Sequence, residues 1–392
     1  MKTKHHSFSK VLPVIFGFLV MGIVDLIGTA INYVKVDFGL NDSTANLLSL
    51  SCFFWFLVLS IPTGFLMNRY GRKNTVLISY IFTLAGLVLP FITYNYGIII
   101  VAFMFIGIGN TIIQVALNPL VTNVVAKEKQ TGTLTLGQFV KALSSWSGPN
   151  IAAWLAGSTL GWKYVLPVFG VITLLAGIWL WATQIPESEK KIEVTSFRST
   201  FALLKDKKIL AFFIGILVLV GVDVGLNTTL PKYLMEKVPS ITDVSHADQL
   251  KSYYYFIVRA VGAFLGGIIL MRVSERKFYT VSAIITLAGM SILLFSSTQS
   301  SILAATVIIA LGYSNLFAII FSLALKHLPQ RANEISSLLI VGVSGGIIAT
   351  LLGVVSDTFG TQWAAMAILA LIWLYMIWLI KPVNSSSNEA PL

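Results

Sequence analysis

The 392-residue chain is too apolar for a water-soluble protein, because 56% of its residues are hydrophobic and only 11% are charged. Soluble domains hold about 45–50% apolar and about 25% charged residues. Cys52 is the single cysteine, which excludes a disulfide framework and a cysteine-based metal centre. With only four histidines as well, we expect no metal and no cofactor. The 27 Lys and Arg against 16 Asp and Glu are typical of the cytoplasmic loops of membrane proteins, so this charge requires no nucleic-acid partner.

Apolar runs of about 20 residues, the length needed to cross a bilayer as a helix, recur along the whole chain. Turn-forming or charged segments separate them. The sequence predicts twelve membrane spans, at Val11–Tyr33, Ala45–Met67, Thr75–Ile92, Tyr96–Ala126, Thr133–Leu155, Tyr164–Thr183, Ile209–Leu234, Tyr253–Met271, Thr280–Ser297, Ile302–Lys326, Ile335–Val355 and Gln362–Ile380.

The longest polar interruption, residues 184–208, divides these spans into six and six. We therefore expect an N-terminal six-helix bundle over 1–183, a cytoplasmic linker over 184–208 and a C-terminal six-helix bundle over 209–392. The two halves share a pattern, since Gly64 after the second span and Gly267 after the eighth each precede a basic loop. The fold class is thus an all-α membrane protein with twelve transmembrane helices in two pseudo-symmetric halves, and its site is expected near the midplane between them.

Loop charges predict the orientation of the chain. With the N-terminus inside, 20 of the 27 Lys and Arg lie on inner segments and 5 on outer ones. Positive charge collects on cytoplasmic loops, so both termini are expected in the cytoplasm. We expect a multi-pass protein of the inner (plasma) membrane, surrounded by lipid and working as a monomer.

The loop after the second span reads Gly64-Phe-Leu-Met-Asn68-Arg69-Tyr-Gly71-Arg72-Lys73, and this stretch resembles the signature loop of the major facilitator superfamily. That resemblance implies a gating role at the cytoplasmic end of this span. Asn68 stands where the family has Asp, so one charge of the family's gating network is missing. The residues that match the signature, and to which the gating role is carried over, are Gly64, Arg69, Gly71, Arg72 and Lys73.

Other stretches are similar to the fucose and glucose/galactose permeases of that superfamily. Gln114-Val-Ala-Leu-Asn118-Pro119 resembles their Glu-x-Ala-x-Asn-Pro pattern, and residues 320–326, 337–346 and 354–357 resemble their later spans. Gln114 replaces the Glu that is thought to carry the coupled proton in the fucose permease, and an amide cannot titrate. Lys141, three residues after Gln138, stands where the subfamily has a sugar-binding amide.

Four charged residues lie inside predicted spans: Asp25, Lys141, Asp223 and Arg259. A charge at a helix centre costs about 2.5–3.5 kcal/mol on insertion scales, and such residues usually face the interior and are paired. The superfamily's arrangement of helices implies the pairs Asp25–Lys141 and Asp223–Arg259. We expect these four residues to couple ion movement to transport, with Asp25 as the preferred proton carrier. The alternative is that both pairs only hold helices together.

Amide side chains in the spans have the donors and acceptors that match the hydroxyl groups of a sugar. Pairs spaced by three or four residues share a helix face. For a lone amide, the alternative is a hydrogen bond between helices. The predicted substrate-binding residues are Gln114, Asn118, Gln138, Lys141, Asn227 and Asn315.

The sequence therefore predicts a secondary active transporter that moves a monosaccharide or related polar metabolite by alternating access, with a co-transported proton. The alternatives are a facilitative uniporter, an exporter of another small molecule and a non-transporting membrane sensor. No pattern typical of an enzyme nucleophile, a phosphate-binding loop or a zinc protease occurs, so we expect no enzyme activity.

Overall fold

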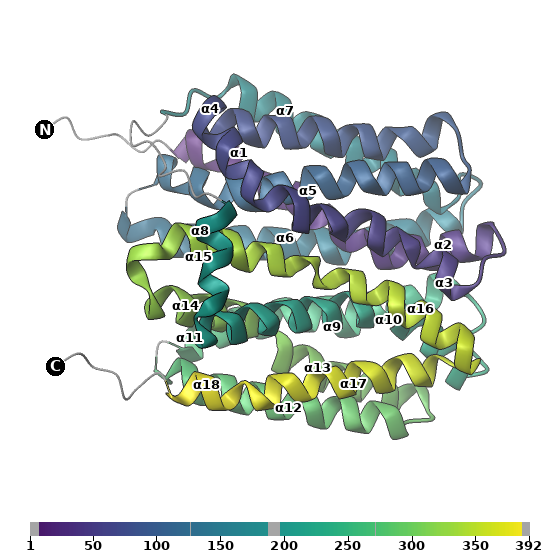
Figure 1. The fold of residues 1–392 in the computed structure, drawn as a ribbon. Coiled ribbons are helices and arrows are strands. Elements are labelled where there is room, and N and C mark those ends of the chain that lie inside the picture. Colours follow the sequence, from purple (N-terminus) through teal and green to yellow (C-terminus); the bar gives the residue numbers. More distant parts are fainter. Residues whose placement is uncertain (1–7, 126, 187–196, 271, 386–392) are drawn as a thin grey trace, which may run out of the picture.

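The computed structural model describes residues 8–125, 127–186, 197–270 and 272–385, and all regular elements in these ranges are helical. Figure 1 shows long helices lying side by side along one direction. The short helix α3 (Asp42–Ala45) lies at one end of this bundle, and α8 (Phe197–Ala202) lies at the other. These two ends are called the α3 end and the α8 end below.

In the first half, three spans depart from a simple helix. The first span is α1, a 3₁₀ turn η1 and α2, so that its middle is wound more tightly than an α-helix. The second and third spans form one continuous element that breaks at Gly71, whose φ of +81° favours glycine. The elements are α1 (Phe8–Met21), η1 (Gly22–Leu26), α2 (Ile27–Asp37), α4 (Leu47–Ile92), α5 (Tyr96–Val124), α6 (Lys127–Ala156), η2 (Trp162–Tyr164) and α7 (Val165–Ala182).

The second half shows the same kind of local departures. The span after α9 contains a π-helical turn, and a later one contains a second 3₁₀ stretch. The elements are η3 (Leu203–Lys205), α9 (Lys207–Lys237), α10 (Val244–Lys251), η4 (Ser252–Ile257, the π turn), α11 (Val258–Leu270), α12 (Glu275–Phe295), α13 (Gln299–Tyr313), α14 (Leu316–His327), η5 (Pro329–Arg331), α15 (Ala332–Val341), η6 (Gly342–Ile347), α16 (Ile348–Phe359), α17 (Gln362–Trp378) and α18 (Ile380–Ser385).

Ten helical segments of the described ranges are long and apolar enough to cross a membrane. One of them, Asp42–Ile92, covers the second and third predicted spans. The fifth predicted span lies in α6, a polar helix that is not among the ten. The eighth was predicted to start at Tyr253, but its helix starts at Val244, because the polar residues before Tyr253 are buried between helices. Residues 187–196 of the predicted linker lie outside the described residues, as do Ala126 and Met271.

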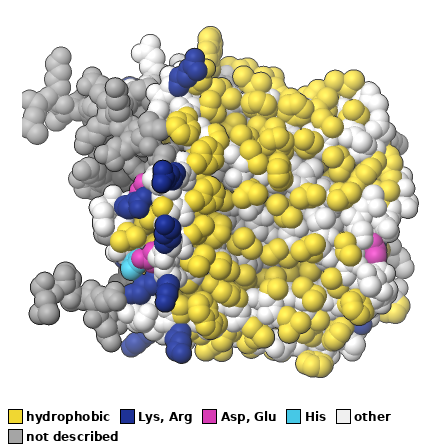
Figure 2. All heavy atoms as spheres, in the orientation of Figure 1, with side chains coloured by type: hydrophobic (Ala, Val, Ile, Leu, Met, Phe, Trp, Pro, Cys, Tyr) yellow, Lys and Arg dark blue, Asp and Glu magenta, His cyan; other side chains and the backbone are white. Residues whose placement is uncertain are grey.

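Two buried hydrophobic clusters form the core. The first is built mainly by α1 to α7, with Val224, Ile340, Val343 and Ala349 added from the second half. The other is built by α9 to α18. Figure 2 shows a mostly hydrophobic surface over the middle of one face, with Lys and Arg side chains gathered toward the α8 end. Such a belt with a basic rim is the surface expected of a protein that spans a bilayer.

Candidate functional site

Arg259 on α11 is the centre of the charged cluster between the halves. Its Nη1 donates to Oδ1 of Asp223 on α9, which is the predicted ion pair within the second half. Its Nη2 lies 3.8 Å from Oδ2 of Asp25 on η1, in the first half. One guanidinium therefore faces two carboxylates, and about a fifth of each of the three side chains is exposed.

Aromatic rings hold this guanidinium in place. Its carbon lies 5.6 Å from the ring centres of Tyr255, Phe256 and Tyr313, within the range of cation–π attraction. The hydroxyl of Tyr255 also donates to Oδ1 of Asp223 at 2.7 Å. Tyr255 and Phe256 belong to the π turn η4, and π turns of this kind are frequent at functional sites. Tyr255 and Arg259 both contact Asp223, so they lie on the same side of the helix.

The predicted pair of Asp25 with Lys141 is wrong in this structure. Among the described residues, Oδ2 of Asp25 instead accepts from the hydroxyl of Ser145 at 2.5 Å and faces Arg259. Ser145 is one helical turn beyond Lys141 on α6, and its hydroxyl also contacts the Lys141 carbonyl. The backbone of Lys141 packs instead beside Gly22, three residues before Asp25. The sequence predicted that these two spans are neighbours, but it did not give their relative depth in the membrane. A shift of one helical turn, about 5.4 Å, is enough to replace Lys141 by Ser145 as the residue beside Asp25.

The predicted amides of α5 lie in two different settings. Gln114 donates to Oδ1 of Asn110 at 2.8 Å, and Asn110 donates to the Met21 carbonyl at 2.8 Å. These two hydrogen bonds tie α5 to the first span. Oδ1 of Asn118 is buried without a hydrogen-bond partner in the described residues.

The other predicted binding residues are dispersed. Nδ2 of Asn227 donates to the Asp25 carbonyl at 2.9 Å, which brings it into the charged cluster from the opposite half. Nδ2 of Asn315, at the break between α13 and α14, donates to the Gly262 carbonyl at 2.9 Å and thus joins two helices of one half. Gln138 is exposed and Lys141 is half-buried, and among the described residues neither side chain forms a hydrogen bond or ion pair with Arg259, Asp25 or Asp223.

A second ion pair lies between the halves and was missed from the sequence. Lys251 and Asp248 are fully buried, and Lys251 Nζ lies 2.8 Å from Asp248 Oδ1. The same ammonium donates to the Asn227 carbonyl at 3.2 Å and to Thr29 Oγ1 at 3.4 Å. Placing the start of the span at Tyr253 assigned both charged residues to a loop. The four-residue steps from Lys251 to Tyr255 and Arg259 are the signal that indicates one helix face.

The signature loop braces helix ends of its own half in this conformation. Nη1 of Arg72 donates to the Pro119 carbonyl at 2.9 Å and to Oδ1 of Asn123 at 2.7 Å, near the end of α5. Nζ of Lys73 donates to the carbonyls of Trp181 and Thr183 at the end of α7, at 2.9 and 2.8 Å. Cations at C-terminal helix ends are favourable, because the last carbonyls have no helical donors.

The remaining signature residues have no comparable role. Gly64 is half-buried inside α4, and the exposed Arg69 lies 5.4 Å from the ring of Tyr70.

Among the described residues, no group of three or more His, Cys, Asp or Glu side chains is placed to hold a metal ion. The charged groups of the site are arranged in ion pairs instead, Asp223 and Asp25 with Arg259, and Asp248 with Lys251.

Comparison with known proteins agrees with this architecture. The family model described as "Major Facilitator Superfamily" matches residues 14–242. This chain belongs to the major facilitator superfamily. It is a membrane transporter of that class and not an enzyme.

Curated relatives extend over most of the chain. This chain is 27% identical over 370 residues to a glucose/galactose transporter of Brucella abortus biovar 1 (strain 9-941). The aligned region covers 85% of this chain and 84% of that protein. It is 23% identical over 361 residues to the L-fucose-proton symporter of Escherichia coli (strain K12), with 82% and 81% covered. The crystal structure of the E. coli fucose:proton symporter FucP is similar with a TM-score of 0.70, at 19% identity, over 97% of this chain and 100% of that one.

Proposed function

We propose that this transporter moves a monosaccharide together with a proton, by alternating access of a site between its halves. Its curated relatives are named as transporters of glucose and galactose and as a proton symporter of fucose. The observation that carries the proposal is the sharing of one Arg259 guanidinium by the carboxylates of Asp25 and Asp223. Two negative charges face one positive charge, so one carboxylate is free to exchange a proton with little change in the rest of the cluster.

Asp25 is the proposed proton carrier. Its contact with Arg259 is the longer one, at 3.8 Å, while Asp223 also accepts from Tyr255. Asp25 lies in the first half and Arg259 in the second, so movement of the halves changes the distance between them. A carboxylate that loses its cation in a poorly solvated site favours the protonated form. Alternating access would thus bring Asp25 to its cation and take it away in turn, which is the requirement for coupling.

The sugar is proposed to bind between this cluster and the amides of α5. Asn118 offers a buried acceptor without a partner, and the amide of Gln114 lies one turn away on α5. Lys141 is the proposed selector of substrate charge, since its ammonium forms no ion pair with Asp25. Three further residues are proposed to act at later stages of the cycle. Gln138 is exposed here, whereas the side-chain amides of Asn227 and Asn315 already donate to backbone carbonyls.

The proposed orientation places the α8 end in the cytoplasm, with both termini, in the inner membrane as a monomer. Lys and Arg gather toward that end in Figure 2. The loop of Arg72 and Lys73 would then stand at the cytoplasmic ends of α5 and α7. The halves 1–183 and 209–392 are proposed to move as the two rigid units.

Transport in proteoliposomes tests the proposal. Glucose, galactose and fucose are each added to lightly buffered vesicles, and external pH and sugar uptake are recorded together. We expect wild-type protein to take up protons with at least one sugar. Asp25→Asn should lose sugar-induced proton uptake and accumulation but keep sugar exchange between equal concentrations, because exchange needs no net proton movement.

The control is Glu275→Gln, which neutralises a carboxylate that pairs with Lys326 near the α8 end. It should keep both sugar and proton movement. Proton uptake that survives in Asp25→Asn would eliminate Asp25 as the carrier. Sugar uptake without any pH change in the wild type would favour the uniporter, and absence of uptake with all three sugars would contradict the sugar assignment.

A further inference from the structure

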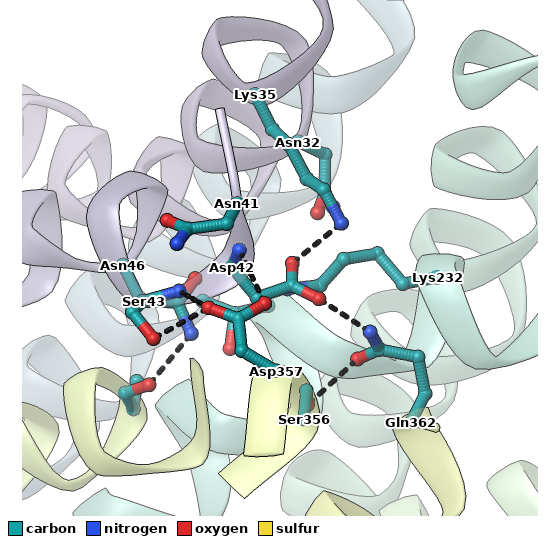
Figure 3. Close-up of polar contacts among 12 residues, drawn as sticks. Asn32, Lys35, Asn41, Asp42, Ser43, Asn46, Lys232, Ser356, Asp357 and Gln362 are labelled. Atoms are coloured by element: carbon teal, nitrogen blue, oxygen red, sulfur yellow. Dashed lines mark hydrogen bonds and ion pairs between the residues drawn. The ribbon is translucent and has the colours of Figure 1, made fainter. Parts of the chain in front are cut away.

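Asp42, at the start of α3, is bound from both halves at once. Its Oδ1 accepts from Lys35 Nζ of the first half and from Lys232 Nζ of α9, each at 2.8 Å. Its Oδ2 accepts from Nε2 of Gln362 on α17 at 2.5 Å. Only 4% of its side chain is exposed, and Figure 3 shows these groups converging on it.

Asp357 on α16 makes the reciprocal contact, from the second half to the first. Its carboxylate accepts from the backbone amides of Asp42 and Ser43 at 2.9 and 2.6 Å, and from the Ser43 hydroxyl at 2.5 Å. It therefore supplies acceptors to the free amides at the N-terminal end of α3. A side chain on Gly353 would meet the Asp42 carbonyl at 2.5 Å, so the two backbones are in direct contact here.

Asn46 completes the junction. Its Nδ2 donates to the Ala349 carbonyl at 2.7 Å, and its own carbonyl accepts from Thr350 at 3.0 Å. These bonds also cross from the first half to the second. The junction therefore closes the α3 end of the structure, and the α3 end cannot open without breaking it.

The charges of this junction divide evenly between the halves. Lys35 and Asp42 belong to the first half and already touch each other. Lys232 and Asp357 belong to the second half, and both contact Asp42 here, Lys232 at Oδ1 of its carboxylate and Asp357 at its backbone amide. Separation of the halves thus leaves one cation and one anion on each side. No unpaired charge is stranded, although one buried partner without its counter-ion would be strongly unfavourable.

We propose that Asp42, Lys35, Lys232 and Asp357 form a latch that closes the α3 end and opens by exchange of ion partners into two neutral pairs, Lys35–Asp42 and Lys232–Asp357. Lys35 has a special part in this latch. Among the described residues, Lys35 bonds within its own half, to Asp42, so it can balance the Asp42 charge once Lys232 has left. The latch therefore predicts opposite effects for the removal of Asp42 and of Lys35.

A cysteine reporter tests the latch without any substrate. Ala349→Cys is placed in a Cys52→Ser background, since Ala349 is fully buried beside the junction. Vesicles are labelled with a membrane-impermeant maleimide from each side in turn. Asp42→Asn should raise the labelling rate about tenfold from the side that the α3 end faces, because two cations then lose their shared anion. Lys35→Met should lower the rate below that of the reporter alone, because Asp42 would be left unpaired in the open state.

Ser43→Ala is a milder second variant, which removes one bond to Asp357 and should raise labelling less than Asp42→Asn. Glu275→Gln, an ion-pair residue within one half, should leave the rate unchanged. Melting temperature and size-exclusion profile identify any variant that fails to fold. Wild-type labelling in both folded Asp42→Asn and folded Ser43→Ala would overturn the latch. An increase in Lys35→Met would overturn the exchange of partners.

Discussion

Asn227 on α9 donates from its Nδ2 to the main-chain carbonyl of Asp25 at 2.9 Å, and so joins the two halves at the carboxylate that faces Arg259. Asp25 lies in the 3₁₀ turn η1, and its carbonyl can accept this bond because a backbone carbonyl has two lone pairs. Asn227 fits closely against Gly28, where an added side chain would meet it at 2.5 Å. The absence of a Cβ at Gly28 therefore sets the distance between α2 and α9.

Gly28→Ala should destabilise the protein by about 1–3 kcal/mol, the usual result of overpacking a close contact. The new methyl group would push the Asn227 side chain, which is only 4% exposed, away from the Asp25 carbonyl. The melting temperature in detergent measures the change. Adding Asn227→Ala to Gly28→Ala should recover part of the loss, since the clash is then removed.

Gly177→Ala is the matched control for that experiment. Its Cβ would meet Tyr80 at 3.6 Å, an ordinary contact, and alanine is the better helix former. The control should melt at the wild-type temperature or above it. Strictly additive effects of Gly28→Ala and Asn227→Ala would contradict a contact between the two residues.

Arg72→Ala should slow transport while equilibrium affinity for the substrate stays within a few fold of wild type. Arg72 contacts the Pro119 carbonyl and Asn123 near the α8 end, away from the Arg259 cluster. Its loss frees the end of α5 from the loop at Gly71 and removes no bond to a proposed binding side chain, since Arg72 contacts the backbone of Pro119 and not the side chain of Asn118. Turnover in proteoliposomes and equilibrium binding by calorimetry separate the two quantities. A large loss of affinity at unchanged turnover would refute the gating role.

Asp206 is the N-cap of α9, and its carboxylate should make the melting temperature of the protein depend on pH. Burial alone would raise its pKa, but the Ile209 and Lys208 amides and His327 hold its pKa below the usual value. A lowered pKa in the folded state means that the stabilisation is fully present above the unfolded value of about 3.9 and is lost as pH falls through the folded pKa. Wild-type melting temperature should therefore converge toward that of Asp206→Asn in acid.

Two variants at this position separate the cap from the charge. Asn is also a good N-cap, so Asp206→Asn keeps the cap and loses the charge that faces His327, and with it the pH dependence. Asp206→Ala loses the acceptor for both amides and should cost about 0.5–2 kcal/mol at neutral pH. An Asp206→Asn protein whose melting curve follows the wild type at every pH would show that the charge has no part in stability.

Several features followed from residue patterns that act over short range. Apolar runs predict spans because each backbone group in a bilayer must bond within its own helix. Gly71 and the basic residues after it predict a break between the second and third spans, and the structure places φ of +81° there. Asp223 with Arg259 was also predictable, since both lie in one half on successive spans, and the structure confirms that ion pair. The family signature added the superfamily itself.

Contacts between the halves depended on the tertiary structure. Whether Asp25 meets Lys141 or Arg259 is decided by the depth and rotation of helices that are far apart in sequence, and a shift of one turn changes the partner. Lys251 and Asp248 read as loop residues because charge predicts exposure, yet packing of α10 between the halves buries both completely. Asp42 likewise has ordinary neighbours in sequence, and only the approach of α9, α16 and α17 makes it the centre of a junction. Local sequence determines helices and their membrane faces through short-range forces, whereas partner choice across the halves is decided by three-dimensional packing alone.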